Sequence, residues 1–231
     1  MSDVRLAFLN ASHNDVHTRR NFRRELPAAL AEYDVTGGEL PESCDFDGCI
    51  VSGSRASVYW DEPWLPPLKA YVADVIDTGV PVLGICFGHQ LLADVLGGTV
   101  EDMGEYEIGY REIERTADAP LFADVGDRFT AFTTHSDTVR ELPDDADLLA
   151  QNEYGIHAFR HADVYGVQFH PEYDTTTAEA ITRAKDELSD ERKERVLAGI
   201  TPEAYADARN ARRVFDNFVE RIVDPRAMVA R

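Results

Sequence analysis

The interpretation of this chain starts from one stretch, Val82-Leu83-Gly84-Ile85-Cys86-Phe87-Gly88-His89-Gln90-Leu91-Leu92-Ala93-Asp94-Val95-Leu96-Gly97. Its apolar start is typical of a buried strand, and the apolar spacing of 91–96 predicts an amphipathic helix directly after it. Glycines two residues before and two residues after Cys86 match the cysteine counterpart of a nucleophile elbow, a sharp strand-to-helix turn that exposes a reactive side chain. The sulfur would face a helix N-terminus, which favours the thiolate. We therefore expect Cys86 to be a nucleophile rather than a buried structural cysteine.

The length and the cysteine content set broad limits. The 231 residues fit one α/β domain over 1–231, and no apolar stretch approaches the length of a membrane span. The N-terminus leads straight into a strand pattern rather than a signal peptide. Three cysteines argue against a disulfide framework and favour a reducing cytoplasm. Cys44 and Cys49 lack the neighbours of a zinc site, so we expect no bound metal.

The charge balance is strongly acidic. The chain has 43 acidic and 23 basic residues, a formal net charge of −20. Nucleic acids and anionic membranes are poor partners for such a charge. The acidic residues are spread along the chain, which predicts an acidic folded surface rather than a disordered tail. Abundant acids with only three lysines resemble proteins of organisms that keep a salty cytoplasm, where salt screens the repulsion.

The first half of the chain alternates strand and helix patterns. Residues 4–9 and 46–54 read as buried strands, and 65–78 as a helix. Residues 18–33 have helical spacing, with a break or kink expected at Pro27. This alternation predicts an α/β fold with an open, mostly parallel sheet and helices on both faces. Ligands of such sheets bind at the carboxyl ends of the strands, where the elbow also lies.

The second half changes character beyond Pro171. Short strands are predicted before it, at 99–103, 109–114, 129–134, 148–151, 156–159 and 165–169. Helices are predicted after it, at 175–187, 190–198 and 201–223, so that about 175–231 forms a helical extension. Thr201-Pro202-Glu203 supplies an N-cap followed by proline at the first helical position.

A cysteine nucleophile needs a base, and the base needs an orienting group. His170 closes the predicted strand 165–169 and is followed by Pro171 and Glu172. Because proline stops the strand, the imidazole and the carboxylate would project together at its carboxyl end. A carboxylate beside a histidine can accept its ring N–H, fix the tautomer and stabilise the imidazolium. We expect His170 and Glu172 to complete a site with Cys86.

These two motifs together resemble those of the class I (triad) glutamine amidotransferases, a family with a flavodoxin-like sheet. Residues 84–90 and 166–172 carry the resemblance, and it extends over about 4–174 and again over the last helix, 213–218. Ser52-Gly53-Ser54 looks like the oxyanion strand of this family, and 134–139 looks like its His-x-Asp-x-Val segment. The loop at 57–64 further resembles stand-alone members related to the amidotransferase domain of GMP synthase.

The resemblance implies glutamine as substrate, attacked by the Cys86 thiolate. The backbone N–H groups of Gly53 and Phe87 would hold the oxyanion. His170 would protonate the departing ammonia, with Glu172 orienting it. The substrate's amino-acid end would be held by the remaining predicted site residues, Gln90, His135, Ser136 and Asp137, of which His135 is expected to act structurally or through a neighbour. The other histidines are expected to pack in a helix (His89) or to lie at the surface (His13, His17, His157 and His161).

Several hypotheses remain open from the sequence. The chain could be a stand-alone glutaminase with an unknown ammonia acceptor, the glutaminase subunit of a two-chain GMP synthase, or a γ-glutamyl amide hydrolase. The sequence has no Gly-rich phosphate loop, so we expect no cofactor, and any ATP-using synthetase would be a separate partner subunit. A non-enzymatic alternative is a redox sensor that uses Cys86 on the same fold. Asp186–Ile200 is an insert relative to the GMP synthase pattern. We expect its apolar face to pack on the core as an extra helix, and the insert to border an acceptor pocket of a stand-alone enzyme.

Overall fold

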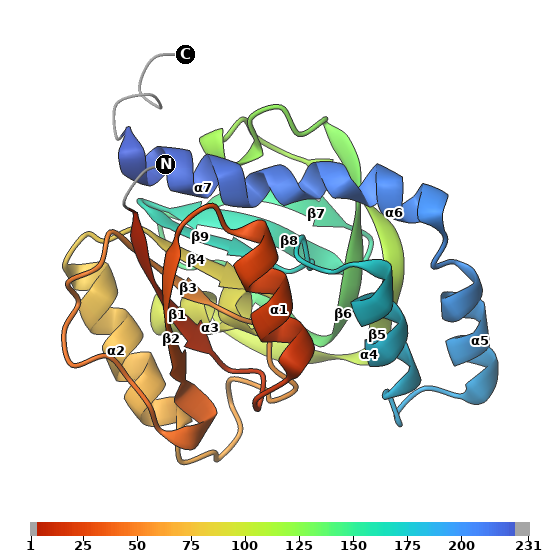
Figure 1. The fold of residues 1–231 in the computed structure, drawn as a ribbon, viewed down its shortest axis with the longest axis horizontal. Coiled ribbons are helices and arrows are strands. Elements are labelled where there is room, and N and C mark those ends of the chain that lie inside the picture. Colours follow the sequence, from red (N-terminus) through yellow and green to blue (C-terminus); the bar gives the residue numbers. More distant parts are fainter. Residues whose placement is uncertain (1–3, 225–231) are drawn as a thin grey trace.

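The computed structural model describes residues 4–224, in which nine strands form one sheet of order β2-β1-β3-β4-β9-β8-β7-β5-β6 (Figure 1). The strands are β1 Arg5–Asn10, β2 Ala29–Asp34, β3 Gly48–Val51, β4 Val82–Ile85, β5 Thr99–Arg115, β6 Arg128–Glu141, β7 Asp147–Asn152, β8 Gly155–His161 and β9 Val164–Val167. The α-helices are α1 Val16–Glu25, α2 Leu65–Asp77, α3 Phe87–Val95, α4 Thr175–Arg183, α5 Asp190–Ala198, α6 Pro202–Ala208 and α7 Arg213–Val223. Short 3-10 helices lie at Val35–Gly37, Pro120–Phe122 and Arg209–Arg212.

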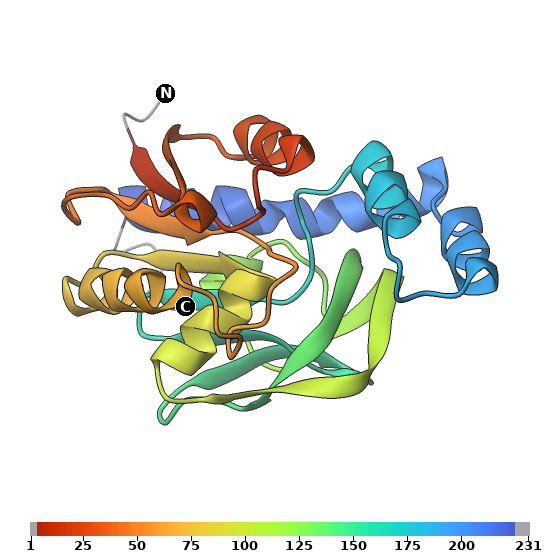
Figure 2. The same cartoon turned by 90° about the horizontal axis from the view of Figure 1, so that it is seen from below.

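The predicted α/β fold with helices on both faces of an open sheet is confirmed. Strands β2, β1, β3, β4 and β9 are parallel, whereas β8, β7, β5 and β6 continue the sheet as antiparallel neighbours. Because side chains alternate along a strand, Leu6 and Phe8 of β1 point to one face, where they pack with α1 and α7. Ala7 and Leu9 point to the other face, toward α2 and α3. Figure 2 shows these helices on opposite sides of the parallel strands.

The predicted helix over 18–33 is wrong in its second half. Helix α1 ends at Glu25, and 29–34 forms β2, the edge strand paired in parallel with β1. Proline has no N–H to donate and pushes the residue before it out of the helical region. Accordingly Leu26 has φ −87° and ψ 120°. The proline therefore ends the helix rather than kinking it.

The three short strands predicted at 99–103, 109–114 and 129–134 belong to two long strands. Strand β5 has 17 residues and includes both 99–103 and 109–114, with a register irregularity between Asp102 and Glu107. Strand β6 has 14 residues and continues through the segment 134–139. The two pair antiparallel along most of their length, and α5 packs against β5 at one end. The pair of strands β5 and β6, called the long arm below, places residues 132–137 beside the carboxyl ends of the parallel strands, where the elbow lies.

The C-terminal region is helical, as predicted, with shorter elements. Helix α4 ends at Arg183 instead of 187, α5 has the predicted bounds, and the predicted helix 201–223 is divided into α6, a 3-10 turn and α7. Side chains of Asp174, Ser189 and Thr201 cap the N-termini of α4, α5 and α6. The remainder of the predicted extension, 225–231, lies outside the described residues. Among those described, no helix combines the length and apolar character that crossing a bilayer requires.

Candidate active site

Cys86 occupies the turn between β4 and α3, where the sequence places it. Its backbone has φ 53° and ψ −102°, a strained conformation for a residue with a Cβ, and the residue is 4% exposed. A Cβ on Gly84 would lie 2.3 Å from the carbonyl oxygen of Gly88, and one on Gly88 would lie 2.4 Å from the carbonyl oxygen of Val51. Both flanking glycines are therefore required, because the helix backbone approaches the strands that closely.

His170 and Glu172 lie beside each other just past the end of β9. The backbone N–H of His170 donates to the carbonyl of Phe132 on β6, at 2.8 Å, which fixes the residue between the parallel strands and the long arm. Its Nδ1 lies 2.8 Å from Oε1 of Glu172, and both residues are at most 5% exposed. Since the carboxylate accepts from Nδ1, the free position of the ring is Nε2, which has no hydrogen-bond partner among residues 4–224.

The charges around His170 favour its protonated form. Burial alone would lower the pKa of the imidazole, but its interactions with Glu172 and with Cys86 outweigh that effect and raise the pKa to about 10. Gly53 lies at the point where the two side chains meet. A Cβ there would lie 2.9 Å from Cε1 of His170 and 3.7 Å from Cβ of Cys86. Such a pair, a sulfur and a proton-donating imidazole, can perform nucleophilic acyl transfer.

A cavity of about 180 Å³ opens onto these side chains. Cys86, His170, Glu172 and Gly53 all line it, as does Thr134, whose carbonyl oxygen is 3.8 Å from the sulfur. Phe87 is the first residue of α3, so its N–H is at the helix N-terminus next to Cys86. The rest of the wall carries charges of both signs, from the segments before α1 and after β3 and from the α4–α5 connection, namely Asp15, Arg55, Lys185, Asp186 and Glu187.

The four residues predicted to hold the substrate's amino-acid end do not line this cavity. Gln90 is buried in α3, and its Nε2 donates to the carbonyl of Asp137 and to Oε1 of Gln168, both at 3.0 Å. The Asp137 side chain accepts from the hydroxyl of Tyr59 at 3.0 Å. Ser136 is half-buried between Asp137 and His135. Thus Gln90 and the 135–137 strand form one hydrogen-bonded unit behind the cavity wall.

A buried ionic cluster that the sequence did not indicate lies next to this unit. Nε2 of His135 is 2.5 Å from Oε2 of Glu107, and Nε2 of His157 is 3.1 Å from the same oxygen. Asn152 donates to the other carboxylate oxygen at 2.7 Å. Burial would raise the pKa of Glu107, but the hydrogen bonds from the two histidines lower it well below its usual value. The carboxylate is therefore ionised inside the protein.

This cluster corrects one prediction. His157 was expected at the surface but is 1% exposed, and burial lowers its pKa. It lies there because β8 is an inner strand of the mixed sheet, so one of its faces is covered. The ligand atoms of Glu107, His135 and His157 lie within 4.8 Å of one another, so these side chains could also surround a metal ion. Long-range strand pairing brings them together, and no spacing in the sequence indicates it.

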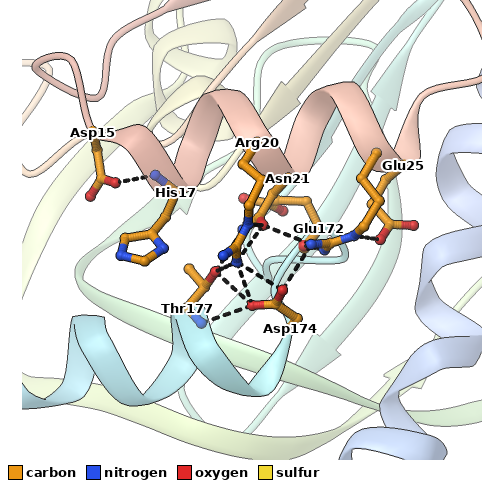
Figure 3. A network of polar contacts seen from close by, with 9 residues as sticks. Asp15, His17, Arg20, Asn21, Glu25, Glu172, Asp174 and Thr177 are labelled. Atoms are coloured by element: carbon orange, nitrogen blue, oxygen red, sulfur yellow. Dashed lines mark hydrogen bonds and ion pairs between the residues drawn. The ribbon is translucent and has the colours of Figure 1, made fainter.

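A second network, also missed, fixes the turn that carries Glu172 (Figure 3). Arg24 of α1 donates to the backbone carbonyl of Glu172 at 2.7 Å and to Asp174 at 2.8 Å. Arg20 donates to both carboxylate oxygens of Asp174 at 2.8 Å, and Asn21 donates to Thr177 of α4 at 2.9 Å. Helix α1 thus holds the His-Pro-Glu turn and the start of α4 together. In the sequence, only the four arginines within the ten residues of α1 indicate this role.

Comparison with known proteins agrees with this geometry. The family model "Glutamine amidotransferase class-I" matches residues 11–185, which is most of the chain. The chain belongs to the class I glutamine amidotransferase family, as its motifs indicated.

Curated relatives in this family are named GMP synthase [glutamine-hydrolyzing]. The protein from Thermomicrobium roseum is 43% identical over 144 residues, which are 62% of this chain and 26% of that protein. The one from Azoarcus sp. is 36% identical over 167 residues, 67% of this chain and 30% of that protein. The matched part of the chain thus spans between a quarter and a third of the length of these relatives.

Solved structures extend the likeness to nearly the whole chain. A glutamine amidotransferase from Thermotoga maritima has a TM-score of 0.79 at 27% identity, with 97% of this chain and all of that chain covered. A glutamine amidotransferase from Methylobacillus flagellatus has a TM-score of 0.76 at 24% identity, with 95% of both chains covered, which shows a shared fold.

Proposed function

We propose that this chain hydrolyses the γ-amide of glutamine with Cys86, His170 and Glu172 as its catalytic triad. The sulfur of Cys86 attacks the γ-carbonyl carbon, and the N–H groups of Gly53 and Phe87 hold the oxyanion. His170 donates its Nε2 proton to the departing nitrogen, which leaves as ammonia from a γ-glutamyl thioester. His170 then takes a proton from water, whose oxygen attacks the thioester and releases glutamate and the thiolate.

One observation carries this proposal: an imidazole between Glu172 and a cysteine at a strained elbow, with its pKa raised to about 10. A ring that is protonated at neutral pH can stabilise a thiolate and can donate a proton to ammonia as it leaves. Gln90, His135, Ser136 and Asp137 fit a supporting part in this scheme. Their hydrogen bonds keep the 134–137 strand in place, and the backbone there remains our proposed contact for the substrate's amino-acid end.

The test is ammonia release from glutamine by the purified chain, measured for the wild type, Cys86→Ala and a matched thiol control, Cys44→Ala. Cys44 is half-buried and far in sequence from the elbow. We expect Cys86→Ala to lose roughly 10⁴-fold or more of kcat, and Cys44→Ala to keep it. Mass spectrometry of an acid-quenched reaction should find a γ-glutamyl adduct on Cys86. Activity of Cys86→Ala within tenfold of wild type would exclude this cysteine as the nucleophile.

Whether the chain works alone is a separate proposal, and we favour a stand-alone enzyme. The α4–α5 connection contributes Lys185, Asp186 and Glu187 to the cavity wall, so the insert borders the chain's own pocket. The second candidate is the amidotransferase subunit of a two-chain GMP synthase, which the names of the curated relatives favour. Ammonia release with and without an added ATP-dependent GMP synthetase separates the two. Binding and strong activation by that synthetase would favour the second candidate.

A further inference from the structure

The ring of Tyr173 stacks on the imidazole of His170. The two ring centroids are 4.1 Å apart and the planes are inclined by 23°. Gly53 lies against Cε1 of the same imidazole, where a Cβ would be only 2.9 Å away. The ring of His170 is thus in contact with Tyr173 and with Gly53, and it is anchored at Nδ1 by Glu172. The triad described above uses Glu172 but assigns no part to Tyr173.

An aromatic cluster continues behind Tyr173. Phe132 packs against it with centroids 5.8 Å apart, and Tyr110 meets Phe132 edge-on at 5.3 Å. The carbonyl of Phe132 also accepts the backbone N–H of His170 at 2.8 Å. Phe132 therefore holds His170 twice, through the backbone and through the ring of Tyr173.

The insert Asp186–Ile200 packs onto this cluster. Leu188 is buried in it, and Val196 and Ile200 of the same segment pack against it, together with Ile108 and Phe132 of the long arm. The apolar side chains of the insert therefore support the same aromatic group that contains Tyr173.

The insert also reaches the nucleophile side of the site. Arg192 donates to the backbone carbonyl of Tyr106, and Nζ of Lys185, just before the insert, lies 4.8 Å from the centroid of the Tyr106 ring. The hydroxyl of Tyr106 is 3.2 Å from Oγ1 of Thr134, whose carbonyl faces the sulfur of Cys86 at 3.8 Å. Two series of contacts therefore run from the same segment, one to each member of the reacting pair.

We propose that Tyr173 is a positioning residue for His170, and that Asp186–Ile200 is a buttress that holds it in place. For the reaction itself this inference rests on the proposed glutaminase. Stacking restricts rotation of the imidazole, so that Nε2 stays directed at its partner. The face of an aromatic ring also stabilises a cation placed over it, which favours the imidazolium over the neutral ring. The insert then serves the site from within the chain instead of receiving a second protein.

Two variants of Tyr173 test the stack. Tyr173→Leu removes the aromatic face, whereas Tyr173→Phe keeps it and loses only the hydroxyl. Tyr110→Leu is the matched control, because it makes the same change in the same cluster, where its ring contact is with Phe132. We expect Tyr173→Leu to lose about 10- to 100-fold in kcat with KM nearly unchanged. Tyr173→Phe should restore activity to within a fewfold of wild type, and Tyr110→Leu should keep it.

A second measurement needs no substrate. The thiolate is the form of cysteine that iodoacetamide alkylates, so the rate at Cys86 reports the thiolate–imidazolium pair. Loss of the aromatic face should lower the pKa of His170 by about 0.5 to 1 unit, which changes the thiolate–imidazolium equilibrium about three- to tenfold and slows alkylation at neutral pH by at most that factor. This measurement tests the stack even if wild-type protein releases no ammonia, an outcome that would defeat the proposed function alone.

The buttress is tested with Leu188→Ala against Leu68→Ala, a change of the same kind in α2 on the other side of the sheet. We expect only Leu188→Ala to shift the alkylation profile in the direction of Tyr173→Leu, by a smaller amount. Thermal melts identify variants that fail to fold, and Tyr173→Met replaces Tyr173→Leu in that case. The inference is overturned if Tyr173→Leu matches Tyr110→Leu in both assays, or if it raises KM with kcat unchanged, which would make Tyr173 a substrate contact.

Discussion

Replacing Glu172 by Gln removes the negative charge beside His170 while keeping the shape of the side chain. In the native protein this carboxylate lies 2.8 Å from Nδ1, and the pKa of His170 is raised from its usual 6.5 to about 10. That difference corresponds to about 5 kcal/mol in favour of the charged ring. Glu172 and Cys86 both raise the pKa of His170 against the opposing influence of burial. We therefore expect Glu172→Gln to lower the pKa of His170 by about 1–3 units.

That shift in the pKa of His170 should change two measurable rates. A lower pKa of His170 moves the equilibrium of the reacting pair from thiolate and imidazolium toward the two neutral groups by about 10- to 1,000-fold, so alkylation of Cys86 at neutral pH should slow by at most that factor. Ammonia release should fall by roughly 10²- to 10³-fold in kcat. His170→Ala should be more damaging, because it removes the group that transfers the proton. Subtracting the alkylation of Cys86→Ser removes the contributions of Cys44 and Cys49.

The free energy of unfolding should also depend on pH in a direction set by the raised pKa of His170. A pKa raised in the folded state stabilises the protein fully below the unfolded value of 6.5, and this contribution is lost as the pH rises through about 10. The deficit in the unfolding free energy of Glu172→Gln should thus be largest below pH 6.5 and should shrink between pH 7 and 10. Denaturant melts across this range measure it. A deficit that does not vary with pH, together with wild-type alkylation rates, would refute the assignment of Glu172 as the group that keeps His170 charged.

Three further predictions concern the scaffold. Gly84→Ala should lower the free energy of unfolding by about 3 kcal/mol, or the Tm by roughly 6–12 °C, because the new Cβ would lie 2.3 Å from a backbone atom. As a control, Gly199→Ala should change the Tm little, because its Cβ would be 3.3 Å from the nearest atom. Glu107→Gln should lower the unfolding free energy in urea by about 1–3 kcal/mol, because an amide replaces the carboxylate that both buried histidines contact and leaves a buried hydrogen bond unmade; an unchanged unfolding free energy would argue against a structural role for this carboxylate. Melting temperatures should rise with potassium chloride, because salt screens a net charge of −20 within about 10 Å at 0.1 M and less above that; a flat or falling Tm would refute the halophile interpretation.

The elbow could be predicted because its chemistry is local. Strand, glycine, cysteine, glycine and helix follow one another within ten residues, and each residue type has a reason that needs no distant partner. The same holds for His170 and Glu172, which are two residues apart at a strand end. Only the meeting of the two motifs is non-local, and the rule that parallel strands present ligand sites at their carboxyl ends supplies it.

The parts that could not be predicted depend on which distant strands become neighbours. The helical spacing over 18–33 did not predict the strand in its second half. Pro27 ends α1, and the remaining residues pair with β1 as an edge strand. The Glu107–His135–His157 cluster joins β5, β6 and β8, and the ring of Phe132 on β6 packs against Tyr173. Such contacts follow from tertiary pairing, and a single sequence shows them only as isolated polar or aromatic residues.

The geometry of the reacting pair is a property of two adjacent strands rather than of loops. Strands β4 and β9 pair in parallel, with Ile85 opposite Val167, and the N–H of Cys86 donates to the carbonyl of Val167 at 2.8 Å. Cys86 and the strand that leads to His170 are therefore joined by a hydrogen bond at the strained residue itself. A shift of one residue in this register would move His170 by the rise of a strand residue, about 3.3 Å, which is more than the reacting groups tolerate. The pairing of β4 with β9 therefore sets the distance between Cys86 and His170, the nucleophile and base that we propose.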